Sequence, residues 1–183
     1  MRAADTAYYA NLWRKAITKP EWAARVAEAR DRALINKPAY FNAAHKTGIA
    51  WGFFAATHWL EASCNPACQI LNGQRWDTVT TIVPKGKGPF ANWEEAALYA
   101  VRYMNLTTEK ADTLEELLHI LEAYNGMGYQ LHGINSPYLC SGTNLYSKGK
   151  YVSDGNYDPN AISAQVGCIP LLKALVASEG SHK

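Results

Sequence analysis

The sequence predicts a mainly α-helical protein with one small β-hairpin, an α+β arrangement in a single domain spanning residues 1–183. Three observations carry this prediction. Apolar residues recur at helical spacing along most of the chain, start and stop signals bracket these segments, and one segment rich in β-branched residues lies between two turn signals. The composition, 48% hydrophobic and 19% charged in 183 residues, is that of an ordinary globular domain with a sizeable core.

Residues 5–35 are predicted to form one or two helices with a break at Lys19-Pro20. Tyr8, Leu12 and Trp13 begin an apolar stripe, and many arginines and alanines occupy the other positions. This composition is typical of packing material with a solvated face, so we expect residues 1–38 to be an N-terminal packing segment without chemistry.

The segment 40–65 contains the carboxylate around which the rest is organised. Five of its residues follow i, i+3, i+4, i+7 and i+10 spacing: Trp51, Phe54, Ala55, His58 and Glu61. Glu61 is therefore expected on or beside the buried stripe, in the last turn before Asn65-Pro66. Burial and the negative end of the helix dipole should raise its pKa, as required of an acid that protonates a glycosidic oxygen. The alternative is an exposed Glu at a fraying helix end.

After this helix the spacing of apolar residues changes from a helical period. Residues 71–74 and 84–89 are turn signals, and the segment 77–83, DTVTTIV, between them is predicted to form a strand of a β-hairpin. Thr80 and Thr81 would lie on opposite faces of that strand, so one face would offer hydroxyls beside a cleft. The alternative is that threonines simply favour strands.

Two capped helices come next. Asn92 with Glu95, and Thr113 with Glu116, have the spacing of helix N-termini, and the second helix should end at Asn125-Gly126. Both helices are expected to be scaffold.

Residues 127–160 have no sustained period and are rich in Gly, Tyr, Ser and Asn, which is typical of a functional loop. Five tyrosines are candidates for lining a groove: Tyr129, Tyr138, Tyr146, Tyr151 and Tyr157. A last helix is expected over 161–177, with Ile162, Val166, Ile169, Leu172 and Leu175 facing the core and a kink at Pro170.

Charge and cysteine usage narrow the function classes. The net charge of +2 is too small to argue for a nucleic-acid partner. No apolar run reaches the roughly 18 residues of a membrane span, and no signal core follows Met1, so we expect cytosolic synthesis without stable membrane insertion. The four cysteines, Cys64, Cys68, Cys140 and Cys168, lack zinc or redox spacing, so we expect free thiols, no metal and no cofactor.

A helix ending in Glu61, followed by a hairpin and a helical bundle, resembles the lysozyme-like superfamily. Residues 58–63, HWLEAS, look like the Glu-Ser segment of goose-type lysozymes and lytic transglycosylases, in which the Glu is the acid, although Ala62 intervenes here. Residues 123–128, AYNGMG, look like the segment of these families that lies across the cleft from the acid.

A closer resemblance, to a phage and bacterial family usually labelled lysozyme-like, covers nearly everything from Trp51 to the last helix. The matching segments begin at His58, Leu71, Val83, Pro89, Leu121, Asn135, Ser141, Gly149 and Tyr157. The family often has Asp after the Asn-Gly turn and Arg before the tongue threonine, where this chain has Gln74 and Val79. This departure leaves Asp77 as the nearest substitute for a second carboxylate.

The resemblance implies a lysozyme-like fold and a muramidase that cleaves the β-1,4 bond between N-acetylmuramic acid and N-acetylglucosamine. Glu61 would be the general acid, Thr80 or Thr81 would orient water or the acetamido group, and Asp77 would act as a base. The expected substrate contacts are His58, Thr81, Tyr124, Asn125, Tyr138, Asn144 and Tyr146.

The expected partner is peptidoglycan, and the expected biological setting is that of a monomeric phage endolysin or virion-associated lysin. Such a protein would be made in the bacterial cytoplasm and act on the cell wall after release, for example through a holin. Two alternatives remain: a lytic transglycosylase using the same Glu61, and a non-catalytic wall-binding or virion structural module. Hairpin hydroxyls that hold a water favour the hydrolase.

Overall fold

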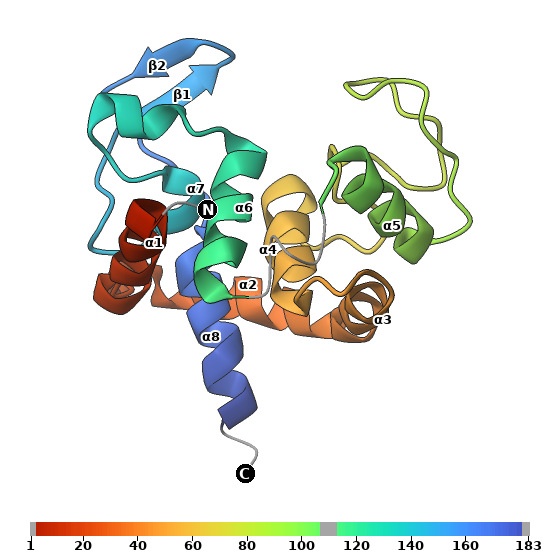
Figure 1. Cartoon of the computed structure of the whole chain (residues 1–183), viewed down its shortest axis with the longest axis horizontal. Helices are drawn as coiled ribbons and strands as arrows, with labels where there is room; N and C mark the ends of the chain where they lie inside the picture. The colour runs from red at the N-terminus through yellow and green to blue at the C-terminus, as the bar shows by residue number, and fades with distance from the viewer. Residues whose placement is uncertain (1–2, 107–112, 181–183) are drawn as a thin grey trace. The chain divides into compact units, whose positions relative to one another are not determined.

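The computed structural model describes residues 3–106 and 113–180 (Figure 1). Over these ranges the protein is mainly helical with a small two-stranded antiparallel sheet, which confirms the coarse prediction. The chain divides into two compact units: unit 1 comprises Met1–Arg30 and Leu114–Lys183, and unit 2 comprises Asp31–Thr113. The single domain and the lysozyme-like fold stay predictions.

Unit 2 is organised by a helix, α4 (Trp51–Ala62), that is buried over most of its length. Its helices are α3 (Lys37–Thr47), α4 and α5 (Trp93–Tyr103), and α3 packs against both α4 and α5. All residues of α4 from Gly52 to Trp59 are buried, as expected of a helix without a polar face. Ser63 and Cys64 then adopt left-handed conformations, with φ of 50° and 57°, so the chain reverses directly after the helix. The predicted cap of α5 is confirmed, because Asn92 Oδ1 accepts a hydrogen bond from Glu95 N at 2.9 Å.

Unit 1 packs its helices around α6. Its elements are α1 (Ala3–Lys15), the 3₁₀ helix η1 (Pro20–Trp22), α6 (Leu114–Asn125), the 3₁₀ helix η3 (Gly128–His132), α7 (Pro137–Cys140) and α8 (Cys168–Gly180). α6 contacts α1, α7 and α8, and α7 contacts α8. The predicted break at Lys19-Pro20 and the predicted end of α6 at Asn125 are confirmed. The unit boundary falls within α2 (Ala23–Ile35), and residues 1–2 of the expected packing segment lie outside the described residues.

The β-hairpin lies in a different segment from the one predicted. Its strands are β1 (Lys150–Ser153) and β2 (Asn156–Asp158), which pair antiparallel with Tyr151 opposite Tyr157. Residues 77–83 form no strand. Three main-chain amides of this segment are already hydrogen-bonded to nearby groups that are not part of a neighbouring strand. Thr80 N donates to Lys87 O at 2.9 Å, and a glutamine side chain binds the next two amides.

The last helix begins later than predicted. α8 starts at Cys168, and residues 161–167 are irregular. Ile162, predicted to face the core, is 65% exposed, whereas Val166, Ile169, Leu172 and Leu175 are buried as predicted. Hydrogen bonds to residues 146–149 hold the irregular segment in place: Gly149 N donates to Ala161 O, and Ser163 N donates to Tyr146 Oη. Pro170 lies in the first turn of α8, where its missing N–H is tolerated, and the expected kink stays a prediction.

The four cysteines are free thiols in the structure, as predicted. In the part of the chain that is described, no helix has both the length and the apolar character needed to cross a membrane.

Candidate active site

Glu61 lies in the final turn of α4 and is partly buried. Removal of water from around the carboxyl raises the pKa of Glu61 from 4.5 to about 7. The sequence predicted this direction from the apolar stripe. At neutral pH about half of the Glu61 carboxyls therefore keep a proton, which suits a general acid.

The turn at residues 71–74 passes directly beside Glu61. A Cβ atom at Gly73 would lie 2.4 Å from the main-chain oxygen of Glu61, and φ of Gly73 is +70°, so this close approach requires glycine. The next side chain, Gln74, binds the loop beyond. Its Nε2 donates to Thr81 Oγ1 at 2.8 Å, and its Oε1 accepts from the amides of Thr81 and Ile82 at 2.9 and 3.2 Å. Gln74 thus connects the turn beside Glu61 to that loop.

Thr80 and Thr81 have different roles in this loop. Thr80 is buried, and its hydroxyl donates to Pro84 O and accepts from Lys87 N at 3.0 Å. The hydroxyl of Thr80 therefore uses both its donor and its acceptor for hydrogen bonds within the loop. Thr80 is a structural residue, and the expectation that it orients water is wrong. Thr81 is exposed, and because its hydroxyl accepts from Gln74, it retains a proton to donate.

Asp77 is held by a neighbouring arginine. Arg75 Nε donates to Asp77 Oδ1 at 2.8 Å, and Arg75 Nη2 pairs with Asp77 Oδ2. This pairing lowers the pKa of Asp77 below 3.8. A carboxylate that is already neutralised and weakly basic is poorly suited to activate water, so the structure argues against the expected role of Asp77 as a base.

His58 is a structural residue and not a substrate contact. It is fully buried, with Nδ1 2.8 Å from Tyr40 Oη and Nε2 2.8 Å from Asn65 O. Because a carbonyl only accepts, Nε2 carries the proton and Nδ1 accepts from the tyrosine. Burial lowers the pKa of His58 to about 4, so the ring is neutral at pH 7. The expected contact between His58 and substrate is corrected, since a fully buried ring cannot reach a sugar.

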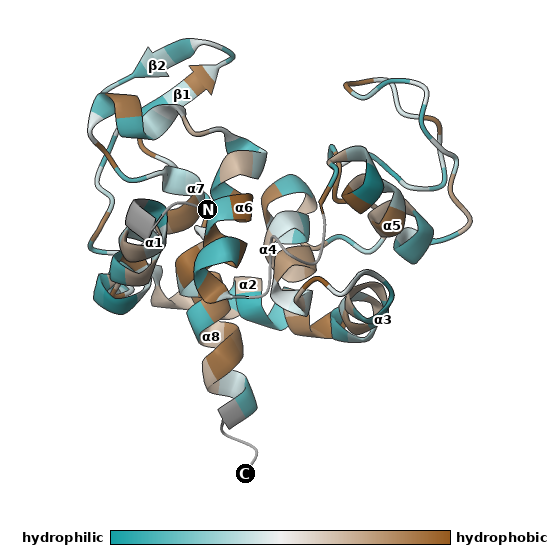
Figure 2. Cartoon of the chain, in the orientation of Figure 1, coloured by the Kyte–Doolittle hydropathy of each residue, from teal (hydrophilic) through white to brown (hydrophobic). Residues whose placement is uncertain are grey.

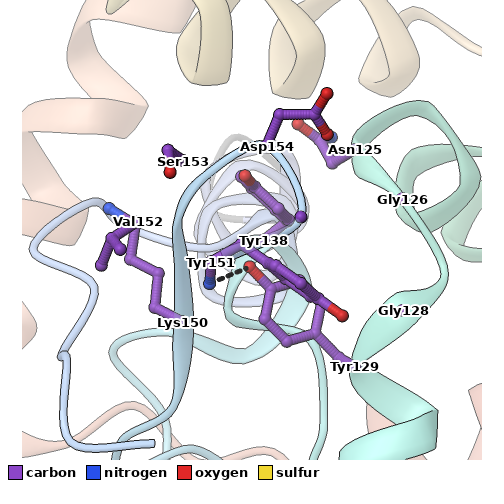
Figure 3. Close-up of a pocket in the computed structure, with 11 residues that line it drawn as sticks. Asn125, Gly126, Gly128, Tyr129, Tyr138, Lys150, Tyr151, Val152, Ser153 and Asp154 are labelled. Carbon is purple, nitrogen blue, oxygen red and sulfur yellow. Dashed lines mark hydrogen bonds between the residues drawn. The ribbon is translucent and has the colours of Figure 1, made fainter. Parts of the chain in front are cut away.

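Unit 1 contains a pocket of about 650 Å³ at the hairpin (Figure 3). Tyr129, Tyr138 and Tyr151 line it, as proposed for the tyrosine-rich loop, whereas Tyr146 and Tyr157 do not. Tyr151 N donates to Tyr129 Oη at 3.3 Å, which fixes the hairpin on η3. Aromatic faces with polar edges are typical of sugar-binding surfaces.

The polar lining of this pocket comes from α6 and from the hairpin tip. Asn125, whose Nδ2 donates to Leu121 O at 3.0 Å, lines the pocket, and its expected contact with substrate stays a prediction. Ser153 and Asp154 at the hairpin tip also line it, and sequence analysis missed both. Their signal was the Asp154-Gly155 pair, which is the two-residue turn favoured in β-hairpins.

Asn144 and Tyr146, two expected substrate contacts, maintain the fold of unit 1. Asn144 Oδ1 accepts from Ile17 N at 2.8 Å, and its Nδ2 donates to Lys15 O at 3.2 Å. Tyr146 is buried, and its hydroxyl donates to Gly149 O at 3.1 Å while accepting from Ser163 N at 3.1 Å. Both residues therefore use their polar groups internally, and their expected contact with sugar is corrected.

Two further residues of α6 are Tyr124 and Glu122. Tyr124 is partly buried, and its expected role toward substrate stays a prediction. Glu122, which sequence analysis did not single out, is fully buried and accepts a hydrogen bond from Tyr9 Oη at 2.7 Å. Burial raises the pKa of Glu122. The sequence feature that indicates burial of Glu122 is its position four residues after Leu118, on the same apolar stripe.

Among the described residues, no group of three or more His, Cys, Asp or Glu is placed to hold a metal ion. Comparisons of this chain with protein-family models, curated proteins and solved structures found no match.

Proposed function

We propose that this protein is a peptidoglycan glycosidase that cleaves the β-1,4 bond between N-acetylmuramic acid and N-acetylglucosamine, with Glu61 as the general acid. The observation that carries the proposal is the Glu61 carboxyl at the end of α4, whose pKa burial raises to about 7. General acid catalysis is most efficient when the pKa of the donor lies near the working pH. The motif resemblance supports peptidoglycan as the substrate.

In unit 2, Thr81 would assist cleavage by positioning water or substrate. Thr81 is exposed, is fixed by Gln74 and keeps a hydroxyl proton to donate, so it would orient water or an acetamido group. In unit 1, the pocket would bind sugar through the faces of Tyr138 and Tyr151 and the amide of Asn125.

A lytic transglycosylase using Glu61 is the second candidate, and one observation favours it. Asp77 is the single carboxylate between Glu61 and Glu94, and Arg75 already pairs with it. A hydrolase needs a base or a nucleophile besides the acid, whereas a transglycosylase uses a hydroxyl of the substrate itself. The two candidates share the acid and differ in their product.

The biological setting belongs to the same proposal. A monomeric phage endolysin or virion-associated lysin would be made in the bacterial cytoplasm and act on the wall after release, for example through a holin. The +2 net charge is compatible with an anionic wall polymer.

The test is the rate at which the protein clears a suspension of permeabilised Gram-negative cells. Glu61→Gln is nearly isosteric and should reduce this rate about a thousandfold, since general acid catalysis contributes roughly 10² to 10⁴. Glu21→Gln, at an exposed glutamate, is the matched control and should lyse normally. Lysis by Glu61→Gln at the wild-type rate would refute the assignment. A wild-type protein that binds sacculi without releasing fragments would be a non-catalytic binding module.

A further inference from the structure

One loop of unit 2 exposes three aliphatic side chains. This segment, residues 77–89, is here called the apolar loop. Val79 is 52% exposed, Ile82 50% and Val83 77%. In Figure 1 the segment extends away from α5 as a loop without strands, and Figure 2 shows apolar colour on several parts of it.

The apolar loop is an ordered structure. Phe90 N donates to Trp76 O at 2.8 Å and closes its base. Inside, the buried Thr80 side chain bonds to Pro84 and Lys87, and Gly86 N donates to Thr80 O at 2.9 Å. Thr80 and Pro84 occupy the interior, so the three aliphatic side chains cannot turn inward without breaking these hydrogen bonds.

After Asp77, which Arg75 pairs, all charges on this loop are positive. Lys85 is exposed and Lys87 partly exposed, and neither forms a hydrogen bond or ion pair through its side chain in the described structure. No Asp or Glu occurs between Asp77 and Glu94. Asp77 is paired with Arg75, and Glu94 is paired with Lys46. The loop with the three aliphatic side chains therefore also carries two lysines whose charge has no carboxylate partner in the described structure.

We infer that the apolar loop binds the surface of an anionic lipid bilayer, with its aliphatic side chains at the headgroup–acyl boundary and Lys85 and Lys87 against lipid phosphates. Exposed apolar side chains next to basic residues are the combination that anionic membrane surfaces bind. A glycan strand carries mostly hydroxyl groups and offers little apolar volume in which to bury three aliphatic side chains, and an apolar protein surface offers no partner for two lysines. The bound state needs no membrane-spanning helix.

The test is co-flotation of the 183-residue chain with vesicles of phosphatidylcholine mixed with phosphatidylglycerol, compared with vesicles of phosphatidylcholine alone. Binding should require the anionic lipid and weaken as salt is added, because salt screens the lysine charges. Lys85→Gln with Lys87→Gln should weaken binding about 25-fold, since each lysine near such a surface contributes about fivefold. Ile82→Ser with Val83→Ser should weaken it at least about tenfold, through loss of apolar burial.

The matched controls are Ile35→Ser, at a side chain that is 76% exposed in the same unit, and Lys15→Gln, at an exposed lysine of α1. Both should bind like the wild type. Glu61→Gln should also bind vesicles normally, which keeps this inference separate from the glycosidase proposal. Absence of wild-type binding to anionic vesicles, or equal binding by the loop variants, would overturn the inference. Loop variants that lose sacculus binding while the wild type ignores vesicles would assign the loop to the wall instead.

Discussion

The Glu61→Gln substitution should stabilise the protein at alkaline pH while it removes activity. The pKa of Glu61 rises from 4.5 to about 7 because the folded protein withholds water from the charged form. A rise of about 2.5 corresponds to about 3 kcal/mol at 1.36 kcal/mol per pKa unit. Glu61 is partly exposed, and solvent screening reduces this penalty to about 2 kcal/mol.

The pH window follows from the sign of this pKa change. Because the folded pKa of Glu61 lies above the unfolded pKa, its stabilising contribution is complete below about pH 4.5 and is lost as the pH rises through about 7. Glutamine does not titrate. The difference in unfolding free energy between Glu61→Gln and wild type should therefore be nearly constant below about pH 4.5. Between about pH 4.5 and about pH 7 it should shift in favour of the variant. Above that pH it should level off about 2 kcal/mol above its value at low pH.

Urea denaturation followed by tryptophan fluorescence, at several pH values from about 4 to 8, measures this difference. Other titrating groups, such as His58, are common to both proteins and cancel in the comparison. Glu21→Gln supplies the control, because it makes the same chemical change at an exposed side chain. A Glu61→Gln difference that is independent of pH would refute the argument that burial raises the pKa of this carboxyl.

Three further predictions concern the reaction. The wild-type kcat/KM for cell-wall digestion should fall about tenfold per pH unit above pH 7, as Glu61 loses its proton, and a plateau well into alkaline pH would contradict this acid. Asp77→Asn should keep lysis within a few-fold of wild type, because Arg75 already neutralises the carboxylate; a thousandfold loss would restore Asp77 as the base. Mass spectrometry of digested sacculi should show reducing muramic acid ends if Thr81 holds a water for hydrolysis, whereas a digest dominated by anhydro ends, lighter by one water, would establish the transglycosylase.

The helices were predictable because their signals are local. The Asn92 cap and the leucine stripe that begins at Leu114 each fix a helix through neighbours a few residues away. The hairpin was misplaced because the β-branched residues of 77–83 outweighed turn geometry in the prediction. A strand needs a partner, and Gln74 and Lys87 occupy the groups that a partner would bind. The Asp154-Gly155 turn was the better signal.

The site was predictable to a similar extent. The apolar spacing of α4 placed Glu61 correctly, but the same spacing should have assigned His58 to the core, since it lies three residues earlier on that stripe. Asn144 and Tyr146 could not be assigned from sequence. Asn144 bonds to main-chain atoms of Lys15 and Ile17, more than 120 residues away, and no local pattern records such contacts.

The acidity of Glu61 depends on burial alone. No charged group contributes to its raised pKa, and the neighbouring His58 is neutral at pH 7, so no cation lowers it. Uncharged contacts hold the chain around the end of α4, because His58 binds Asn65 O where the chain reverses and Gly73 packs on the main chain of Glu61. A substitution that admits water to this turn should therefore lower the pKa of Glu61, whereas a sugar that covers the carboxyl should raise it. Substrate binding would thus keep the acid protonated at the pH at which it must donate.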